Sequence, residues 1–266
     1  MIAEFSPAAE QFRRDYAAHR ASEGRGLDIA ALRTLPYLRR GPLAKQWSVR
    51  ARTFDVFLRR VVRPLASEFG PPLRVADLGA GNGWLSYRLA CEGHCGTAID
   101  IRDDQVDGLG AARQLLAETR FTCQVASFDA LPLGDGSVDL AVFNASLHYA
   151  TDLAATLAEA ARVVRAGGRI VVLDSPFYRS VVEGEAMVAE KHATAAARFG
   201  DRAETLLALP FIEYLTAGSL RDTLPALQWR RHAVRYPLWY EMRPLLALLR
   251  GRRPPSRFDL WVAEVA

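Results

Sequence analysis

The chain has few cysteines, almost no lysine and no long apolar run. Its only cysteines are Cys91, Cys95 and Cys123, and an odd count argues against a framework of disulfides. A zinc site made of these three and His94 is disfavoured, because C-x3-C lacks the C-x2-C spacing that usually pairs with a second cluster. We therefore expect no metal, and we expect the cysteines to lie in the core or in turns.

The absence of a long apolar run also bears on location. No stretch approaches the ~20 apolar residues of a membrane-spanning helix. Residues 1–20 carry charges where a signal peptide has its apolar segment. We therefore expect a soluble, cytoplasmic protein; the sequence does not indicate its oligomeric state.

Lysine is almost missing, since Lys45 and Lys191 are the only two, and arginine supplies the other basic residues. The net charge is +4. No basic cluster forms a long run with interleaved aromatic residues, so nucleic acid is an unlikely partner. The short clusters lie at 39–40, 59–60, 230–231 and 250–253.

Between residues 71 and 175, short β-rich runs alternate with helical patterns. One helix begins near Trp84, and others are expected over 103–118 and 153–166, the last ending at Gly167-Gly168. Apolar strands that alternate with helices predict βαβ crossovers and a parallel sheet covered on both faces. The expected strands are 73–78, 95–101, 120–126, 138–146 and 169–175.

The flanking segments differ from this core. Residues 1–70 predict a helical N-terminal cap, and residues 176–225 a helical lid over the substrate. Residues 226–266 contain two alternating segments, 229–237 and 257–265, with a helical stretch between them. These segments would complete an α/β, doubly wound, mostly parallel sheet of seven strands. The helices of the cap are expected over 8–19, 28–34 and 44–67.

A glycine-rich turn follows the first expected strand, in the stretch VADLGAGNGWLS (75–86). The dinucleotide fingerprint G-x-G-x-x-G/A needs a small residue where Trp84 stands, which disfavours a nicotinamide dehydrogenase. Asp77 precedes the turn, and its charge would repel a pyrophosphate. The pattern predicts a ligand with a cationic or hydrogen-donating group and no phosphate, such as S-adenosylmethionine. Asp77 could instead be a solvent-bridged acid at a strand end.

Asp100 stands at the end of the second expected strand, about one βαβ repeat after Gly79. An acid at this place accepts hydrogen bonds from ribose hydroxyls. The alternative is that Asp100 caps the helix that follows. The upstream glycine turn favours the ligand role.

With these features and two later motifs, the chain resembles a class I S-adenosylmethionine-dependent methyltransferase of the type 11, or ubiquinone/menaquinone-methylase-like, group. The resemblance implies a Rossmann-like fold, S-adenosylmethionine as cofactor and S-adenosylhomocysteine as product. It covers about two-fifths of the chain and rests on VADLGAGNGWLS (75–86), AIDI (98–101), ALPLGDGSVDLAVFNASLHY (130–149) and LAEAARVVRAGGRIVVLD (157–174).

The same resemblance implies positions for the cofactor. The turn residues would line its methionine and ribose, Asp100 would take the ribose hydroxyls, Ile101 would lie beside the adenine, and Asn144 and Ala145 would lie near the sulfonium. The turn residues are Gly79, Ala80, Gly81 and Gly83.

One departure concerns the adenine. The family often has an Asp-Ala pair before the Leu-Pro pair, and here Ser127 and Phe128 occupy that place. Ser127 would make a weaker contact, Phe128 would pack on the ring, or Asp129 would substitute after a shift. These alternatives stay open.

Methyl transfer is an in-line displacement, so the protein mainly positions the acceptor and excludes water. His148, with Tyr149 beside it, is the best candidate for a general base. Alternatively, His148 packs over the cofactor or caps the next helix. Trp47 and Arg50 lie on the helix before the core, where an arginine could pair with the methionine carboxylate; they could equally be a core residue and a solvated charge.

The sequence therefore predicts a methyltransferase that acts on an oxygen, nitrogen or carbon atom of a small molecule. The alternatives are an RNA or protein methyltransferase and a non-catalytic S-adenosylmethionine-binding module. The stretch Asn144–Leu147 lacks the N-P-P-Y-like tetrapeptide of enzymes that methylate amino groups of bases or glutamine. This disfavours an RNA or protein methyltransferase.

Overall fold

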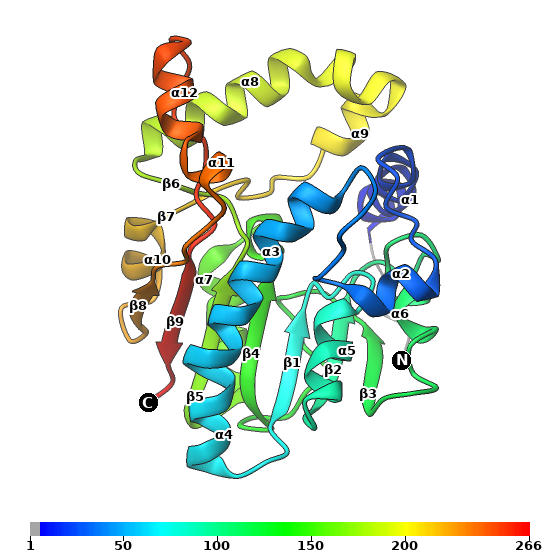
Figure 1. The fold of residues 1–266 in the computed structure, drawn as a ribbon, viewed down its shortest axis with the longest axis vertical. Coiled ribbons are helices and arrows are strands. Elements are labelled where there is room, and N and C mark those ends of the chain that lie inside the picture. The colour runs from blue at the N-terminus through cyan, green and yellow to red at the C-terminus, as the bar shows by residue number, and fades with distance from the viewer. Residues whose placement is uncertain (1–5) are drawn as a thin grey trace.

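The computed structural model describes residues 6–266 and contains one seven-stranded sheet with helices on both faces (Figure 1). The strand order is β3-β2-β1-β4-β5-β9-β8; the first five strands are parallel, and β9 runs antiparallel to both neighbours. This architecture confirms the predicted Rossmann-like fold class. The strands are β1 (Arg74–Leu78), β2 (Cys95–Asp100), β3 (Phe121–Val125), β4 (Val138–Asn144), β5 (Val164–Leu173), β8 (Gln228–His232) and β9 (Leu260–Glu264).

Each face of the sheet buries its own apolar cluster. In β4, Leu140 and Val142 pack with the cluster that contains α3 (Ala44–Phe57) and α5 (Trp84–Cys91). Ala141 and Phe143 pack on the other side, with α7 (Leu153–Val163) and α10 (Ala217–Thr223). Successive side chains of a strand point to opposite faces, so a continuous apolar strand is buried on both sides.

The N-terminal helices agree with the predicted ones. Helix α1 (Pro7–Ser22) begins at Ser6, whose hydroxyl accepts a hydrogen bond from the Ala9 amide, and α2 is Ile29–Thr34. The expected helix 44–67 is one continuous rod in three parts: α3, the π-helix η1 (Leu58–Val62) and α4 (Arg63–Phe69).

The segment after β5 is mainly helical, as expected. It contains α8 (Val181–Phe199), η3 (Gly200–Arg202), α9 (Ala203–Leu207) and α10, and α11 (Leu238–Glu241) and α12 (Arg243–Leu249) follow β8. A small sheet of β6 (Phe177–Tyr178) and β7 (Leu215–Thr216) was not predicted. Helices α1, α8, α9 and α12 gather at the end of the sheet where its parallel strands finish (Figure 1). Within residues 6–266, no helix is long and apolar enough to cross a membrane.

Two predicted helices are wrong in extent. Only α6 (Leu109–Arg113) forms within 103–118, because Asp104 accepts hydrogen bonds from the amides of Val106 and Asp107, both at 3.0 Å, and so stabilises a turn. Helix α7 ends at Val163, and β5 begins directly after it. Gly167, with φ +76°, lies inside β5, where its amide donates to the Val265 carbonyl at 2.8 Å. The glycine pair therefore does not end the helix.

Asp77 is an acid buried within β1. Its side chain accepts a hydrogen bond from the Ser86 hydroxyl of α5 at 2.8 Å, and its second oxygen has no partner among the described residues. Burial raises the pKa of Asp77 to about 7, since removing a carboxylate from water disfavours its charged form. Asp77 thus joins the first strand to the helix that follows the glycine turn.

The raised pKa predicts a pH-dependent effect of Asp77→Asn on stability. Between pH ~4 and ~7 the folded protein keeps the Asp77 proton while the unfolded chain releases it, so ionisation weakens the folded state as pH rises. Asparagine imitates the protonated acid. We expect the variant to match the wild type near pH 4 and to be more stable by roughly 1–4 kcal/mol above pH 7. Urea unfolding at several pH values measures this; a difference that does not grow with pH would contradict it.

Candidate functional site

A cavity of about 610 Å³ lies where the first, second and fourth strands end. The turns after these strands form its floor, and α1, α3 and the segment 209–211 close it. Ligands of open α/β sheets bind at this edge, because the strand order reverses there. The cavity is lined by thirteen of the sequence-predicted site residues: Trp47, Arg50, Gly79, Ala80, Gly81, Asp100, Ile101, Ser127, Phe128, Asp129, Asn144, Ala145 and Tyr149.

The glycine turn brings backbone to the cavity. Gly79 and Gly81 have φ angles of +76° and +54°, and a Cβ on Gly79 would lie 2.3 Å from the Ser146 Cβ. Gly83 has another role, since it precedes α5 with φ +72° and a Cβ there would lie 2.6 Å from the Ala112 Cβ. Gly79, Ala80 and Gly81 line the cavity, whereas Gly83 and Asp77 do not.

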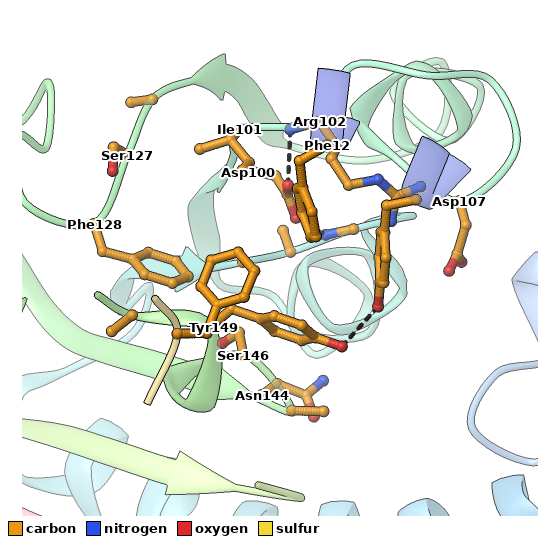
Figure 2. A pocket seen from close by; sticks show the side chains of 18 of the residues that line it. Phe12, Asp100, Ile101, Arg102, Asp107, Ser127, Phe128, Asn144, Ser146 and Tyr149 are labelled. Atoms are coloured by element: carbon orange, nitrogen blue, oxygen red, sulfur yellow. Dashed lines mark hydrogen bonds between the residues drawn. The ribbon is translucent and has the colours of Figure 1, made fainter. Parts of the chain in front are cut away.

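Asp100 holds the turns after β1 and β2 together. One carboxylate oxygen accepts the Gly81 amide at 2.8 Å. The other accepts the Arg102 amide at 2.8 Å (Figure 2). Burial raises the pKa of Asp100, and the two amide donors and the Arg102 charge oppose this rise. Each oxygen can accept a further hydrogen bond, so the turn-holding role leaves room for a ligand hydroxyl.

The three adenine candidates all line the cavity. The Phe128 ring packs against Phe143, with ring centroids 5.7 Å apart, and points toward the space beside Tyr149 (Figure 2). Ser127 and Asp129 flank it in the chain. The geometry therefore brings the alternatives to one wall and does not separate them.

The end of β4 supplies an unpaired acceptor. The side-chain oxygen of Asn144 is buried and has no hydrogen-bond partner among residues 6–266. Ala145 follows with φ +56°, and its amide donates to the Leu173 carbonyl at 2.8 Å. Ser146 donates its hydroxyl to the Leu78 carbonyl at 2.5 Å, which fixes this turn against β1. A buried oxygen without a donor indicates a place for a ligand donor.

Arg50 supplies a positive charge without a partner. Its guanidinium lies 5.0 Å from the centroid of the Trp47 ring, and it has no hydrogen bond or ion pair with another described residue. Burial lowers the pKa of Arg50, and the Asp174 carboxylate opposes this effect. A largely buried cation without an ion pair among residues 6–266 favours an anionic ligand group beside it.

His148 and Tyr149 follow β4 in the short helix η2 (Leu147–Tyr149). Tyr149 lines the cavity, and its hydroxyl lies 2.8 Å from that of Tyr16. His148 does not line the cavity; burial, with the charges of Lys191 and Arg50, lowers its pKa to about 3. The His148 imidazole is therefore neutral at pH 7 and a weak base.

Helix α1 contributes residues that the sequence did not single out. Phe12, Tyr16 and Arg20 line the cavity, and their spacing of four places them on one helical face. Arg20 pairs with Asp107 at 2.5 Å, and Asp107 also accepts the Asn82 side-chain amide at 2.8 Å. The spacing of these three residues could have indicated one helical face from the sequence. Nothing in the sequence indicated the surface that this face covers. Further unpredicted lining residues include Arg25, Arg102, Thr156 and Leu209.

No group of three or more histidine, cysteine or acidic side chains suited to a metal occurs within residues 6–266. The three cysteines are free thiols.

Comparisons with known proteins agree with this geometry. Residues 76–172 match a family model described as "Methyltransferase domain". The chain is 32% identical over 158 residues to malonyl-[acyl-carrier protein] O-methyltransferase of Erwinia pyrifoliae, covering 58% of this chain and 54% of the relative. It is 36% identical over 122 residues to demethylmenaquinone methyltransferase of Mycobacterium marinum, covering 45% and 48%. The chain thus spans about half the length of the curated relatives it matches.

Solved structures extend the likeness in fold. Geranyl diphosphate C-methyltransferase from Streptomyces coelicolor, solved with Mg²⁺, geranyl diphosphate and S-adenosylhomocysteine, aligns with 99% of this chain and 100% of its own at a TM-score of 0.59 and 17% identity. At that identity the match concerns the fold alone. Residues 76–172 are thus similar to a methyltransferase domain, and the chain shares its fold with a methyltransferase that was solved with S-adenosylhomocysteine.

Proposed function

We propose that the chain is a small-molecule methyltransferase that moves a methyl group from S-adenosylmethionine to an oxygen, nitrogen or carbon atom by in-line displacement. The observation that carries this proposal is the 610 Å³ cavity, because it combines the glycine turn, Asp100, Asn144 and an unpaired Arg50 at one sheet edge. The relatives support it, since their names record methylation of malonyl-[acyl-carrier protein] and demethylmenaquinone.

The chain's own residues have distinct parts in this proposal. Gly79, Ala80 and Gly81 admit the methionine and ribose close to the backbone, and Asp100 accepts the ribose hydroxyls. Arg50 pairs with the methionine carboxylate, and Asn144 accepts from its ammonium. When bound, the sulfonium supplies an activated methyl group, while the protein positions the acceptor and excludes water.

The aromatic part of the remaining lining favours an apolar or aromatic acceptor. Four aromatic side chains from three segments meet beside the cofactor wall: the Phe12 and Phe211 rings lie 5.0 Å apart, the Phe211 and Tyr149 rings 5.4 Å, and the Tyr149 and Tyr16 rings 5.8 Å. Aromatic walls with few polar groups suit apolar ligands. In this proposal residues 1–70 act as the cap, residues 176–225 as the lid, and the protein works in the cytoplasm.

Neither of the two residues that the sequence predicted as catalytic titrates near neutral pH. Burial and the Tyr16 hydroxyl raise the pKa of Tyr149 well above its usual value, so Tyr149 keeps its proton and serves as a hydrogen-bond donor to the acceptor. His148 stays neutral behind it. Proton removal, where the acceptor carries one, then depends on the acceptor's own acidity or on water.

The first test is binding of S-adenosylhomocysteine, measured by isothermal titration calorimetry. We expect Arg50→Met to weaken binding by roughly ten- to a hundredfold, since a charge-assisted hydrogen bond contributes about 1.5–3 kcal/mol. Arg52→Met is the matched control: Arg52 is exposed on the same helix and does not line the cavity, so affinity should stay within twofold. Equal affinities for wild type and Arg50→Met would refute the proposed carboxylate contact.

Radiolabelled methyl transfer to an extract, before and after ribonuclease or protease treatment, distinguishes an enzyme that acts on small molecules from the alternatives.

The second test concerns pH. Because the pKa of His148 is about 3, we expect no inflection from this histidine in kcat/KM between pH 5 and 8. His148→Asn should keep the shape of the profile, whereas Tyr149→Phe should lower kcat/KM by about tenfold through loss of one hydrogen bond. An inflection near pH 6.5 that disappears in His148→Asn would show that His148 acts as a general base.

A further inference from the structure

The exposed apolar side chains of this protein are concentrated at one place. Among the ten large apolar side chains exposed within residues 6–266, six belong to α11 and α12 and a seventh, Met242, lies between these helices. Two more, Val181 and Val182, begin α8. Leu238, Leu248 and Leu249 are 77%, 74% and 75% exposed. Such a gathering is unusual on a soluble surface and indicates an interaction site. We call the seven side chains the apolar tip: Leu238, Trp239, Met242, Leu245, Leu246, Leu248 and Leu249.

Positive charge lies at the same place. Residues 238–257 contain five arginines and one acid, Glu241, for a net charge of +4. Arg250 and Arg252 are exposed, and neither side chain has a hydrogen bond or ion pair with another residue of 6–266. The apolar tip is therefore bordered by cations that are free to meet an anionic partner.

We propose that the apolar tip and its arginines dock this protein on a membrane surface rich in anionic lipids. The leucines would enter the boundary between headgroups and acyl chains, Trp239 would lie at the interface, and Arg250 and Arg252 would contact lipid phosphates. Neither part is sufficient for stable docking by itself, and the structure combines both. Helix α12 stands at the end of the molecule that also carries α1, α8 and α9, so docking would bring the cavity's cover toward the lipid (Figure 1).

The charge distribution disfavours a second copy of the chain as the occupant. A two-fold contact through the tip would place the same surface on both sides, and with it the exposed Arg250 and Arg252 of one copy against those of the other. An acidic protein would satisfy the arginines, but the tip consists of seven apolar side chains on two short helices and offers few polar groups for specific recognition. A lipid surface requires only apolar area and positive charge.

The experiment is sedimentation of the full chain with vesicles. One set contains phosphatidylcholine alone, and the other contains about one-third phosphatidylglycerol. We expect at least tenfold stronger partitioning onto the anionic vesicles at ~0.1 M salt, and loss of this preference at ~1 M salt, where screening is strong. Equal or absent binding to both vesicle types would overturn the proposal.

Paired variants separate the two contributions. Leu248→Glu with Leu249→Glu should reduce partitioning at least tenfold, and Arg250→Glu with Arg252→Glu should remove the preference for anionic vesicles. The matched control is Arg59→Glu with Arg60→Glu, an equal charge change on exposed residues of η1, which should partition like the wild type. Circular dichroism and thermal unfolding verify that each variant folds.

Three outcomes would count against the docking site. One is unchanged vesicle binding by the folded Leu248→Glu/Leu249→Glu variant. Another is loss of binding in the Arg59→Glu/Arg60→Glu control, which would show that overall charge decides. The third is a tip-dependent dimer in light scattering, or a tip-dependent complex with an acidic protein, without vesicle binding. Since none of these measurements uses the cofactor or methyl transfer, the proposal stands or fails independently of the proposed function.

Discussion

The site depends on the hydrogen bonds that the Asp100 carboxylate accepts. It accepts the amides of Gly81 and Arg102, both at 2.8 Å, and so joins the turns after the first two strands. Asp107 extends this connection, because it accepts from Asn82 of the glycine turn and pairs with Arg20 of α1. One set of buried acids thus fixes the turn, the second strand's end and the covering helix relative to one another. Removing a partner from such a network would leave a buried charge uncompensated.

The unpaired groups around the cavity have the opposite character. Within the part of the chain that the structure describes, Arg50 has no hydrogen bond, and the side-chain oxygen of Asn144 has no donor. Folding leaves these groups unsatisfied, and a ligand with an anionic and a hydrogen-donating end would satisfy both. S-adenosylmethionine has such an end, which is why cavity and family point to the same cofactor.

Some peripheral helices bury their apolar side chains above the sheet, and others expose them at the surface. Helix α1 buries Phe12 against Ala195 and Phe199 of α8 and Leu206 of α9, so the first and the inserted helices share a small core above the sheet. Helices α11 and α12 leave most of their apolar side chains exposed. Leucine and aromatic side chains therefore form a buried core between α1, α8 and α9, and an exposed surface on α11 and α12.

Local patterns in the sequence predicted the sheet and the edge of the sheet at which the cavity lies. These patterns are local, because each depends only on residues that are close together in the chain. They are the apolar strands at 73–78 and 138–146, the glycines of the turn after the first strand, and Asp100 at the end of the second strand. Only the tertiary structure decided which side chains share the cavity: it brought Tyr16 to Tyr149 across 133 residues, turned His148 away, and directed Asp77 to Ser86. It also moved Gly167 into a strand, because pairing with Val265 is a long-range contact. Local periodicity contains no information on such distant partners, whereas burial, hydrogen bonding and the pKa of each group depend on them.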